Sequence, residues 1–481
     1  MRPGVVVANR FRIERIAGVG GMGTVFQATD LVAGGSVALK ILTGIGEHDA
    51  ARFVREAVVL AELVHPGIVR YLAHGLTTDH EHYLAMEWLE GETLHDRLGR
   101  GRLSVAEALV LGRALAEALA VAHARGVVHR DIKPMNLFLP GGELAKLKVL
   151  DFGIARLVKQ VGMLTHTGAV IGTPGYMAPE QVRGETDVDA STDVFGVGCV
   201  LYHCLTGVPA FAGNPIAVLA KILLEDVRPL GELVAVPREL DELVLAMLHK
   251  DRSARPANGR VVASELARIA AGELSEELSS TVVSVGTLAA TATTGSRVGV
   301  TAFERRLVSL VLMLPIAESS DEELHQVAMV ATTYRGKLVR IVDGANLVVF
   351  GHAETAPDHA ARAARCALAL RELHPTARYV VASGRAAVGA HLVGEVIDRA
   401  VAESVGAPSG QIVIDDATSH LLDERFAIEG DRYLWGSRTA PSTHTGSSAA
   451  RACSSVGTAR SARSRRCGLR ARTIGWRTSS S

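Results

Sequence analysis

The sequence predicts a multidomain α+β protein in which a β-rich segment, a helical segment and a separate mixed α/β domain follow one another. Short strand-type runs alternate with one helical stretch over residues 12–95, and apolar residues recur at helical spacing over 104–124, with further helix-like stretches over 191–272. Both patterns return over residues 303–436. At about 150 residues per domain, the 481 residues of the chain exclude a single small module.

The first segment is expected to be a sheet that carries one helix. Its expected helix is Asp49–Leu63, and its expected strands are Arg12–Ile16, Thr24–Gln27, Ser36–Leu42, Ile68–Leu72 and Tyr83–Trp88. Ser104 is a predicted N-cap for a helix that runs to Ala124, because its side chain can accept hydrogen bonds from the first amides of that helix. Further helices are expected between Ser191 and Gly272. This second segment is therefore mostly helical.

Residues 273–302 are crowded with Ser, Thr, Gly and Ala and show no sustained period, which predicts a flexible linker. The chain is thus expected to contain an N-terminal extension at 1–11, a first domain at 12–272 and a second domain at 303–436. In the second domain we expect helices at Asp321–Tyr334, at Thr355–Leu373 and around Arg399, with strands at Arg306–Leu314, Lys337–Val342, Asn346–Phe350, Tyr379–Ser383 and Gln411–Ile414.

The last segment, residues 437–481, is rich in Arg and Ser, and no acidic residue follows Asp431. Few large apolar residues occur there, which predicts a disordered tail. Two interpretations stay open. The segment is either the product of a slipped reading frame in a GC-rich gene or a genuine basic tail that contacts nucleic acid or acidic partners.

The overall composition is that of a globular protein, with 48% hydrophobic and 21% charged residues. Lys and Arg number 51, as do Asp and Glu, so the net charge is zero, which argues against nucleic acid as a general partner. The five cysteines are scattered, without the spacing of a zinc site, and fit a reducing cytoplasm. No apolar run reaches the roughly 18 residues of a membrane span. We therefore expect a cytoplasmic protein.

A glycine-rich loop is expected between the first two strands, where the sequence reads Gly18-Val19-Gly20-Gly21-Met22-Gly23-Thr24-Val25. Glycine lets the backbone approach and cover phosphates with its amide groups turned towards them. The pattern is weak by itself, since glycine-rich hairpin turns are common. Lys40 follows on an apolar strand, where its charge needs phosphate or carboxylate partners. Glu56 is the candidate carboxylate, and the alternative for Glu56 is a solvated helix face.

The strongest signal is the loop His129-Arg130-Asp131-Ile132-Lys133-Pro134-Met135-Asn136. It places a carboxylate, a lysine and an amide within a few residues of one another. Asp131 can accept or orient a hydroxyl proton, Lys133 can neutralise a transferring phosphate, and Asn136 can bind a metal. Asp151 follows an apolar strand and precedes Phe152-Gly153, and it supplies a second metal ligand.

In this order, these motifs resemble those of protein kinases, and the resemblance runs from about residue 12 to about residue 270. It implies a bilobal kinase fold, with a β-rich N-lobe and a helical C-lobe, that uses ATP and Mg²⁺, with Mn²⁺ as an alternative. Lys133, and Thr173 before Pro174, resemble the serine/threonine branch. The GGMG and GTPGYMAPEQ segments resemble bacterial kinases of eukaryotic (Hanks) type.

The resemblance also implies a role for each matching residue. Asp131, Lys133, Lys40 and Glu56 would be catalytic, and Asn136 and Asp151 would hold the metal. Met86 would guard the back of the adenine pocket, and the backbone of Glu87 to Leu89 would bind adenine. The whole set of expected ATP contacts is Gly18, Val19, Gly20, Gly21, Gly23, Val25, Ala38, Lys40, Met86, Glu87 and Leu89.

Two further groups follow from the same resemblance. Thr165 and Thr167 lie where related kinases are phosphorylated, and Arg130 is the expected partner of that phosphate. Glu180, Asp193 and Arg255 would be structural, with Arg255 paired to Glu180.

The alternative to an active kinase is a kinase-like scaffold that signals by association. Such proteins usually lose the lysine, the catalytic aspartate or the metal aspartate, whereas Lys40, Asp131, Asn136 and Asp151 are all present. The sequence therefore favours an enzyme that phosphorylates Ser and Thr of proteins, itself included.

The second domain resembles class III nucleotidyl cyclases, which implies a ferredoxin-like α/β fold. The resemblance rests on Glu304–Leu312, on Val342-Asp343-Gly344 before an apolar strand, and on Gly394–Ala400. Active members hold two metal ions with two aspartates, but Leu314 stands in the first position and only Asp343 survives. Asp398 and Ala402 replace the asparagine and arginine that act on the transition state.

These losses remove much of the electrostatic stabilisation on which such chemistry depends. We therefore expect a degenerate domain used for regulation or association, which could pair two chains into a homodimer. A nucleotide cyclase is the weakest alternative.

Overall fold

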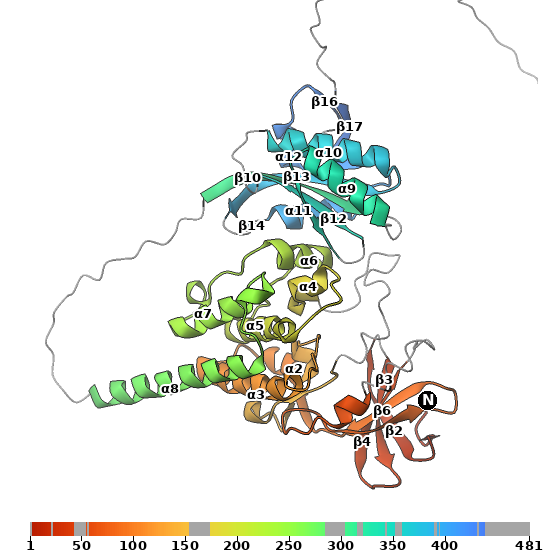
Figure 1. Cartoon of the computed structure of the whole chain (residues 1–481), viewed down its shortest axis with the longest axis vertical. Helices are drawn as coiled ribbons and strands as arrows, with labels where there is room; N and C mark the ends of the chain where they lie inside the picture. Colours follow the sequence, from red (N-terminus) through yellow and green to blue (C-terminus); the bar gives the residue numbers. More distant parts are fainter. Residues whose placement is uncertain are drawn as a thin grey trace, which may run out of the picture. The chain divides into compact units, whose positions relative to one another are not determined.

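The computed structural model describes residues 2–20, 23–42, 54, 57–152, 174–283, 304–314, 321–341, 344–351, 358–388, 392–393, 395–430 and 432–437. Two bodies of regular structure are visible in Figure 1, one made from the first 283 residues and one from residues 304–437. Of the predicted tail, Ser437 is the last residue of a strand, and residues 438–481 lie outside the described residues.

The first body begins with an antiparallel sheet of six strands in the order β1-β2-β3-β4-β6-β5. Its strands are β1 (Val6–Val7), β2 (Phe11–Gly20), β3 (Gly23–Asp30), β4 (Ser36–Leu42), β5 (Tyr71–Leu76) and β6 (His82–Glu87). Phe11, Ile13, Phe26 and Leu39 pack into its own apolar core. Of the helix predicted between the third and fourth strands, the described residues 54 and 57–61 are helical.

The rest of this body is mostly helical and includes a small sheet of three strands, β7 (Gly91–Thr93), β8 (Leu137–Pro140) and β9 (Lys148–Val149). Its helices are α2 (Leu94–Leu98), α3 (Val105–His123), α4 (Pro179–Val182), α5 (Ala190–Thr206), α6 (Pro215–Leu224), α7 (Arg238–Met247) and α8 (Gly259–Val283). Short 3₁₀ turns lie at Pro134–Asn136, Leu144–Lys146, Pro174–Tyr176, Leu230–Glu232 and Arg252–Ala254. Figure 1 shows the strands gathered at one end of this body and the long helices at the other.

Two predictions about helices can be compared with the structure. Ser104 caps α3 as predicted, since its side chain accepts a hydrogen bond from Glu107 N while Glu107 caps Ser104 in return. The predicted start of the linker at residue 273 is wrong, because α8 continues to Val283. Leu274 and Leu278 are spaced by one helical turn, and the glutamates between them are good helix formers, which outweighs the serines there.

The second body is built on one mixed sheet of eight strands, with the order β11-β12-β10-β13-β15-β17-β16 and with β14 paired to β13. Its strands are β10 (Glu304–Leu314), β11 (Lys337–Arg340), β12 (Asn346–Phe350), β13 (Arg378–Val388), β14 (Leu392–Val393), β15 (Ile412–Ile414), β16 (Phe426–Glu429) and β17 (Tyr433–Ser437). Its helices are α9 (Asp321–Thr333), α10 (His359–Leu373), α11 (Val396–Ser404) and α12 (Asp416–Leu421). The predicted mixed α/β character is confirmed, and the strand Asn346–Phe350 has the predicted bounds.

Both faces of this sheet are buried. Successive side chains of a strand point to opposite faces, and consecutive residues of β10 are apolar and buried. Val311 and Met313 pack with residues of α9 and α10 on one face. Val308, Leu310 and Leu312 point to the other face, where α11 lies against β10 and β13.

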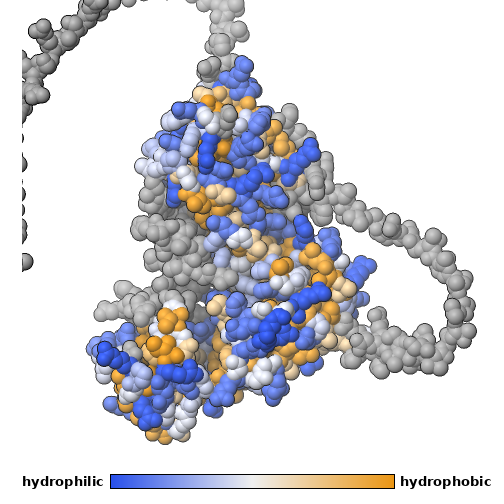
Figure 2. Space-filling view, turned by 180° about the vertical axis from the view of Figure 1, so that it is seen from behind, coloured by the Kyte–Doolittle hydropathy of each residue, from blue (hydrophilic) through white to orange (hydrophobic). Residues whose placement is uncertain are grey.

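On the face seen in Figure 2, hydrophobic side chains are interspersed with hydrophilic ones over both bodies. None of the helices formed by the described residues is long and apolar enough to cross a membrane.

Candidate active site

The glycine-rich loop joins β2 to β3, and the described part of it is a hairpin in which Gly18 pairs with Val25 and Gly20 with Gly23. Gly21 and Met22 lie outside the described residues. Gly23 has φ +142°, and a Cβ there would overlap the carbonyl of Ile41 on the neighbouring strand. Only glycine fits at this position, and Val19 at the turn is exposed, with a relative accessibility of 77%.

Lys40 lies on β4 between Val25 of β3 and Leu84 of β6. Its Nζ is 2.8 Å from Oδ1 of Asp151. The expected partner, Glu56, lies outside the described residues. The contact with Asp151 brings two predicted site residues together that are far apart in the sequence.

Asp131 is held by two neighbours through one of its carboxylate oxygens. Lys133 Nζ lies 2.9 Å from Asp131 Oδ2, and Asn136 Nδ2 donates to the same oxygen over 2.9 Å. Among the described residues, no hydrogen bond or ion pair reaches the other oxygen, Oδ1. The side chain of Asp131 is 44% exposed and is therefore accessible from solvent.

Asn136 and Asp151 have the donor set that suits Mg²⁺, which binds one or two carboxylates and fills its remaining positions with phosphate and water. Asn136 uses its amide nitrogen on Asp131, which leaves its carbonyl oxygen for a cation. The backbone carbonyl of Asn136 also accepts a hydrogen bond from Leu150 N over 2.8 Å, which fixes it beside the strand that leads into Asp151. Among the described residues no group of three acidic, His or Cys side chains could hold a metal alone.

Two residues of this site have left-handed backbone conformations that non-glycine residues rarely adopt, Arg130 with φ 67° and Asp151 with φ 51°. Asp193, on the first turn of α5, accepts hydrogen bonds from the backbone N–H groups of His129 and Arg130, both over 2.7 Å. His123 also contacts Asp193, with Nε2 2.8 Å away. Asp193 therefore anchors the strained loop.

Phe152 packs against His129, with ring centroids 4.6 Å apart. Tyr71 of β5 was not predicted to belong to the site, yet its hydroxyl is buried beside Asp151 and Phe152. Burial raises the pKa of the Tyr71 hydroxyl, and the charge of Asp151 adds to the effect. The sequence carried no signal for this contact, because Tyr71 lies in a run that is typical of an ordinary strand.

The predicted adenine-binding segment begins at Glu87, the last residue of β6. Met86 is buried and pairs with Ala38 of β4 across the sheet. Glu87 ends the strand, and Leu89 is partly buried against the core of the helical part. The structure thus places Ala38, Met86 and Leu89 where β4 and β6 meet the helical part.

Glu180 and Arg255 form a buried ion pair, as expected from the sequence. Arg255 Nη1 and Nη2 lie 2.8 and 2.9 Å from the two oxygens of Glu180. Burial would raise the pKa of Glu180, but the hydrogen bonds and charge of Arg255 outweigh it, so the pKa of Glu180 is lowered.

The predicted regulatory threonines, Thr165 and Thr167, lie outside the described residues, as does Thr173. Arg130 is described, and its guanidinium makes no ion pair within the described part of the chain. Gln181, which the sequence did not single out, donates to the backbone carbonyl of Arg130 over 2.8 Å.

In the second body, Leu314 is buried at the end of β10. Asp343 lies outside the described residues. Asp398 and Ala402 lie one turn apart on α11.

Comparisons with known proteins identify the family of the first domain. The protein kinase domain family matches residues 11–267, more than half of the chain, and the chain therefore belongs to this family. Serine/threonine-protein kinase pkn2 of Myxococcus xanthus is 38% identical over 283 residues, which cover 55% of this chain and 33% of that protein. Serine/threonine-protein kinase PknB of Mycolicibacterium smegmatis is 38% identical over 277 residues, which cover 56% of this chain and 44% of that protein.

This chain thus spans less than half of the length of the curated relatives it matches. Among solved structures, the kinase domain of Mycobacterium tuberculosis PknI is 26% identical, with a TM-score of 0.46 over 56% of this chain and 98% of that one.

Proposed function

We propose that this protein is a bacterial serine/threonine protein kinase that transfers the γ-phosphate of ATP to Ser and Thr hydroxyls of proteins, itself included. The observation that carries the proposal is the arrangement of Asp131. Lys133 and Asn136 hold one of its oxygens and leave the other for a substrate hydroxyl. Membership of the kinase family and similarity to proteins named as serine/threonine kinases support the same conclusion.

Each residue then has a step in the reaction. The glycine-rich hairpin covers the phosphates, and Lys40 orients them. Asp151 and Asn136 would hold Mg²⁺, which when bound would neutralise charge on the phosphates. Asp131 accepts or orients the hydroxyl proton of the substrate, and Lys133 stabilises the group being transferred.

The contact between Lys40 and Asp151 fits this scheme. Both side chains face the same space, one with a charge for phosphate and one with a charge for the metal. In the nucleotide complex Lys40 would have a phosphate as its partner, and Asp151 would have the metal. Glu56 is the residue that we propose to hold Lys40 in that state.

Regulation is proposed through Thr165 and Thr167. A phosphate there adds about −1.5 to −2 charges, and the guanidinium of Arg130 would pair with it. Arg130 is suited to this, because Asp193 and Gln181 fix its backbone on both sides.

For the second domain we propose a degenerate cyclase-like fold that pairs two chains rather than making a cyclic nucleotide. Its sheet order, its helices on both faces and the hairpin between β11 and β12 support the resemblance. Leu314 cannot ligate a metal, and Ala402 cannot act on a phosphate. Pairing would bring two kinase domains together for mutual phosphorylation in the cytoplasm.

The competing function is a nucleotide-binding scaffold without transfer activity. Lys40→Met and Asp131→Asn variants separate the two, because both should abolish phosphorylation of protein while the fold stays intact. A scaffold would show no incorporation of phosphate in the unmodified protein.

A further inference from the structure

One partly buried ion pair joins the two ends of the nucleotide site. Glu87 is the last residue of β6 and the first of the segment proposed to bind adenine, and Lys148 begins β9, three positions before Asp151. Lys148 Nζ lies 2.7 Å from Glu87 Oε1, and the two side chains are only 19% and 25% exposed. The residues are 61 positions apart, so the contact is a tertiary one.

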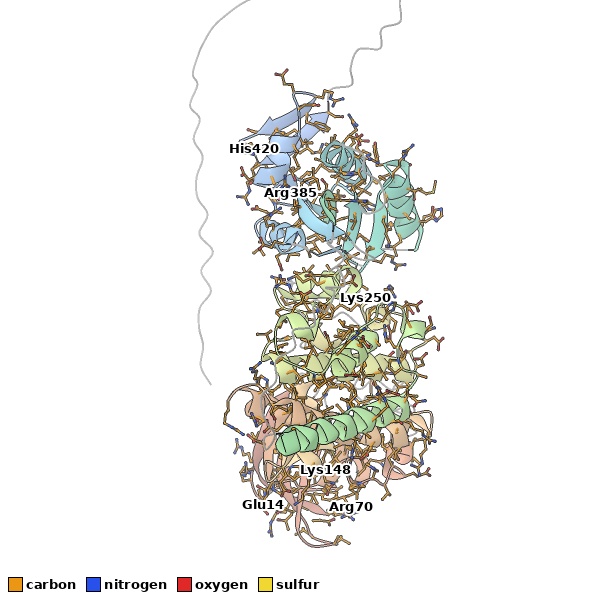
Figure 3. The ribbon with its side chains drawn as sticks, turned by 90° about the vertical axis from the view of Figure 1, so that its left-hand side faces the viewer. Glu14, Arg70, Lys148, Lys250, Arg385 and His420 are labelled. Carbon is orange, nitrogen blue, oxygen red and sulfur yellow. The ribbon has the colours of Figure 1, made fainter. Side chains whose placement is uncertain are left out.

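The pair belongs to a larger clamp that includes the loop at 67–70. Glu87 Oε1 accepts a second hydrogen bond from Arg70 N over 2.8 Å, and Glu87 N donates to Arg70 O over 3.0 Å. The next residue of β9, Val149, donates to Gly67 O over 2.8 Å and accepts from Val69 N over 3.1 Å. Figure 3 labels Arg70 and Lys148, which both lie in the lower part of that view.

This connection is unlike the surface ion pairs of the same body. Lys146 and Glu143 are also 2.7 Å apart, but their side chains are 63% and 55% exposed, and they lie within one short turn. Exposed pairs of that kind contribute little. The pair of Lys148 and Glu87 is screened less by water, and it connects separate elements.

We propose that Lys148 is a positioning residue for nucleotide binding, which fixes the adenine-binding backbone at Glu87 relative to the strand that carries Asp151. The inference deepens the proposed function and rests on it. Glu87 turns its carboxylate to Lys148 and Arg70, and these two side-chain contacts add to the pairing of Glu87 with Val37 of β4 in holding its backbone. Without Lys148, the carboxylate keeps only the Arg70 amide and the hinge backbone gains freedom.

The expected effect is on binding rather than on the chemical step. Loss of one partly buried, charge-assisted contact should raise the Kd for nucleotide by about three- to ten-fold. The KM for ATP should rise by a similar factor, and kcat should change by less than about two-fold, because Asp131, Lys133 and Asn136 are untouched.

The test uses the full chain and isothermal titration with a non-hydrolysable ATP analogue and Mg²⁺. Lys148→Met should weaken binding, Lys148→Arg should restore it to within about two-fold of the unmodified protein, and Lys146→Met is the matched control that should bind normally. Glu87→Gln keeps an acceptor for Arg70 N and gives a second, gentler variant if Lys148→Met does not fold. A protein with both Lys148→Met and Glu87→Gln should bind the nucleotide only slightly more weakly than Glu87→Gln alone, because the ion pair is already broken in the single variant.

Several results would overturn the inference. Normal binding by a folded Lys148→Met or Glu87→Gln variant would do so, as would equal weakening by Lys146→Met. Because binding is measured without phosphate transfer, the two proposals fail differently. An unmodified protein that binds no nucleotide refutes both, whereas one that binds but does not transfer phosphate refutes only the proposed kinase activity.

Discussion

The buried pair of Glu180 and Arg255 gives the sharpest prediction about stability. Arg255→Met removes the guanidinium and leaves the Glu180 carboxylate in an enclosure where it is only 2% exposed. Thr192 Oγ1 still donates to Glu180 over 2.7 Å, but one hydroxyl cannot compensate for a buried charge. The variant therefore should be strongly destabilised in the kinase domain.

The magnitude follows from the burial of a carboxylate that no longer has a cationic partner. Breaking a buried ion pair by removal of one partner costs about 3–5 kcal/mol. For a domain of this size about 1 kcal/mol shifts the melting temperature by roughly 2–4 °C, so a decrease of roughly 6–20 °C is expected. The effect should shrink on acidification. In the unmodified protein the pKa of Glu180 is lowered, so the stability that the ion pair contributes is lost as the pH falls through that pKa. In the variant, protonation of Glu180 removes the unpaired buried charge and therefore stabilises the fold.

The assay is scanning calorimetry of the full chain, in which the kinase transition is identified by its shift on addition of nucleotide. Arg183→Met is the matched control, because Arg183 and Glu185 form an exposed pair 3.4 Å apart. It should change the free energy of unfolding by less than about 0.5 kcal/mol. A destabilisation by Arg255→Met no larger than that of the control would refute the reasoning.

Lys250, the pair Thr165 and Thr167, and the second domain each give a further prediction. Lys250 is buried with Nζ 4.3 Å from the Phe211 ring centroid, and burial lowers the pKa of Lys250 to about 7. Between pH 7 and the ordinary pKa of 10.5, the unfolded chain therefore binds more protons than the folded one. The free energy of unfolding, measured by denaturant titration, should then rise from pH 7 to 10. Lys250→Met should flatten this rise. A Thr165→Ala/Thr167→Ala double variant should lose activation by autophosphorylation, and full activity in it would contradict the regulatory proposal. Purified 303–436 with ATP or GTP and Mg²⁺ or Mn²⁺ should give no cyclic nucleotide, and a product that disappears on Asp343→Ala would disprove the proposal of a degenerate domain.

Much of the site could be predicted because kinase chemistry is carried by short contiguous motifs. Asp131, Lys133 and Asn136 are close in the sequence, and a short loop cannot separate them, so their proximity in the structure follows from spacing. The same holds for the cap at Ser104, where the partner Glu107 is three residues away. The strand at Asn346–Phe350 was predictable because its last four residues are apolar. All five of its residues are buried.

Contacts between distant segments could not be predicted. The contact of Lys40 with Asp151 and that of Lys148 with Glu87 depend on how the sheet meets the helical part, which no local pattern encodes. The end of α8 at Val283 was missed for a different reason. Serine and threonine lower helix propensity only by fractions of about 1 kcal/mol per residue, so a helix already begun can continue through a stretch that resembles a linker.

The most direct test of the central claim is transfer of labelled γ-phosphate from ATP, with Mg²⁺, by the unmodified protein and by Asp131→Asn. The asparagine keeps the shape of the side chain and can still accept a hydrogen bond, but it cannot take the hydroxyl proton. We expect label on Ser and Thr of the unmodified protein, and none on Asp131→Asn despite unchanged nucleotide binding. Equal labelling of the two proteins, or labelling of neither, would contradict the assignment of Asp131 and with it the proposed function.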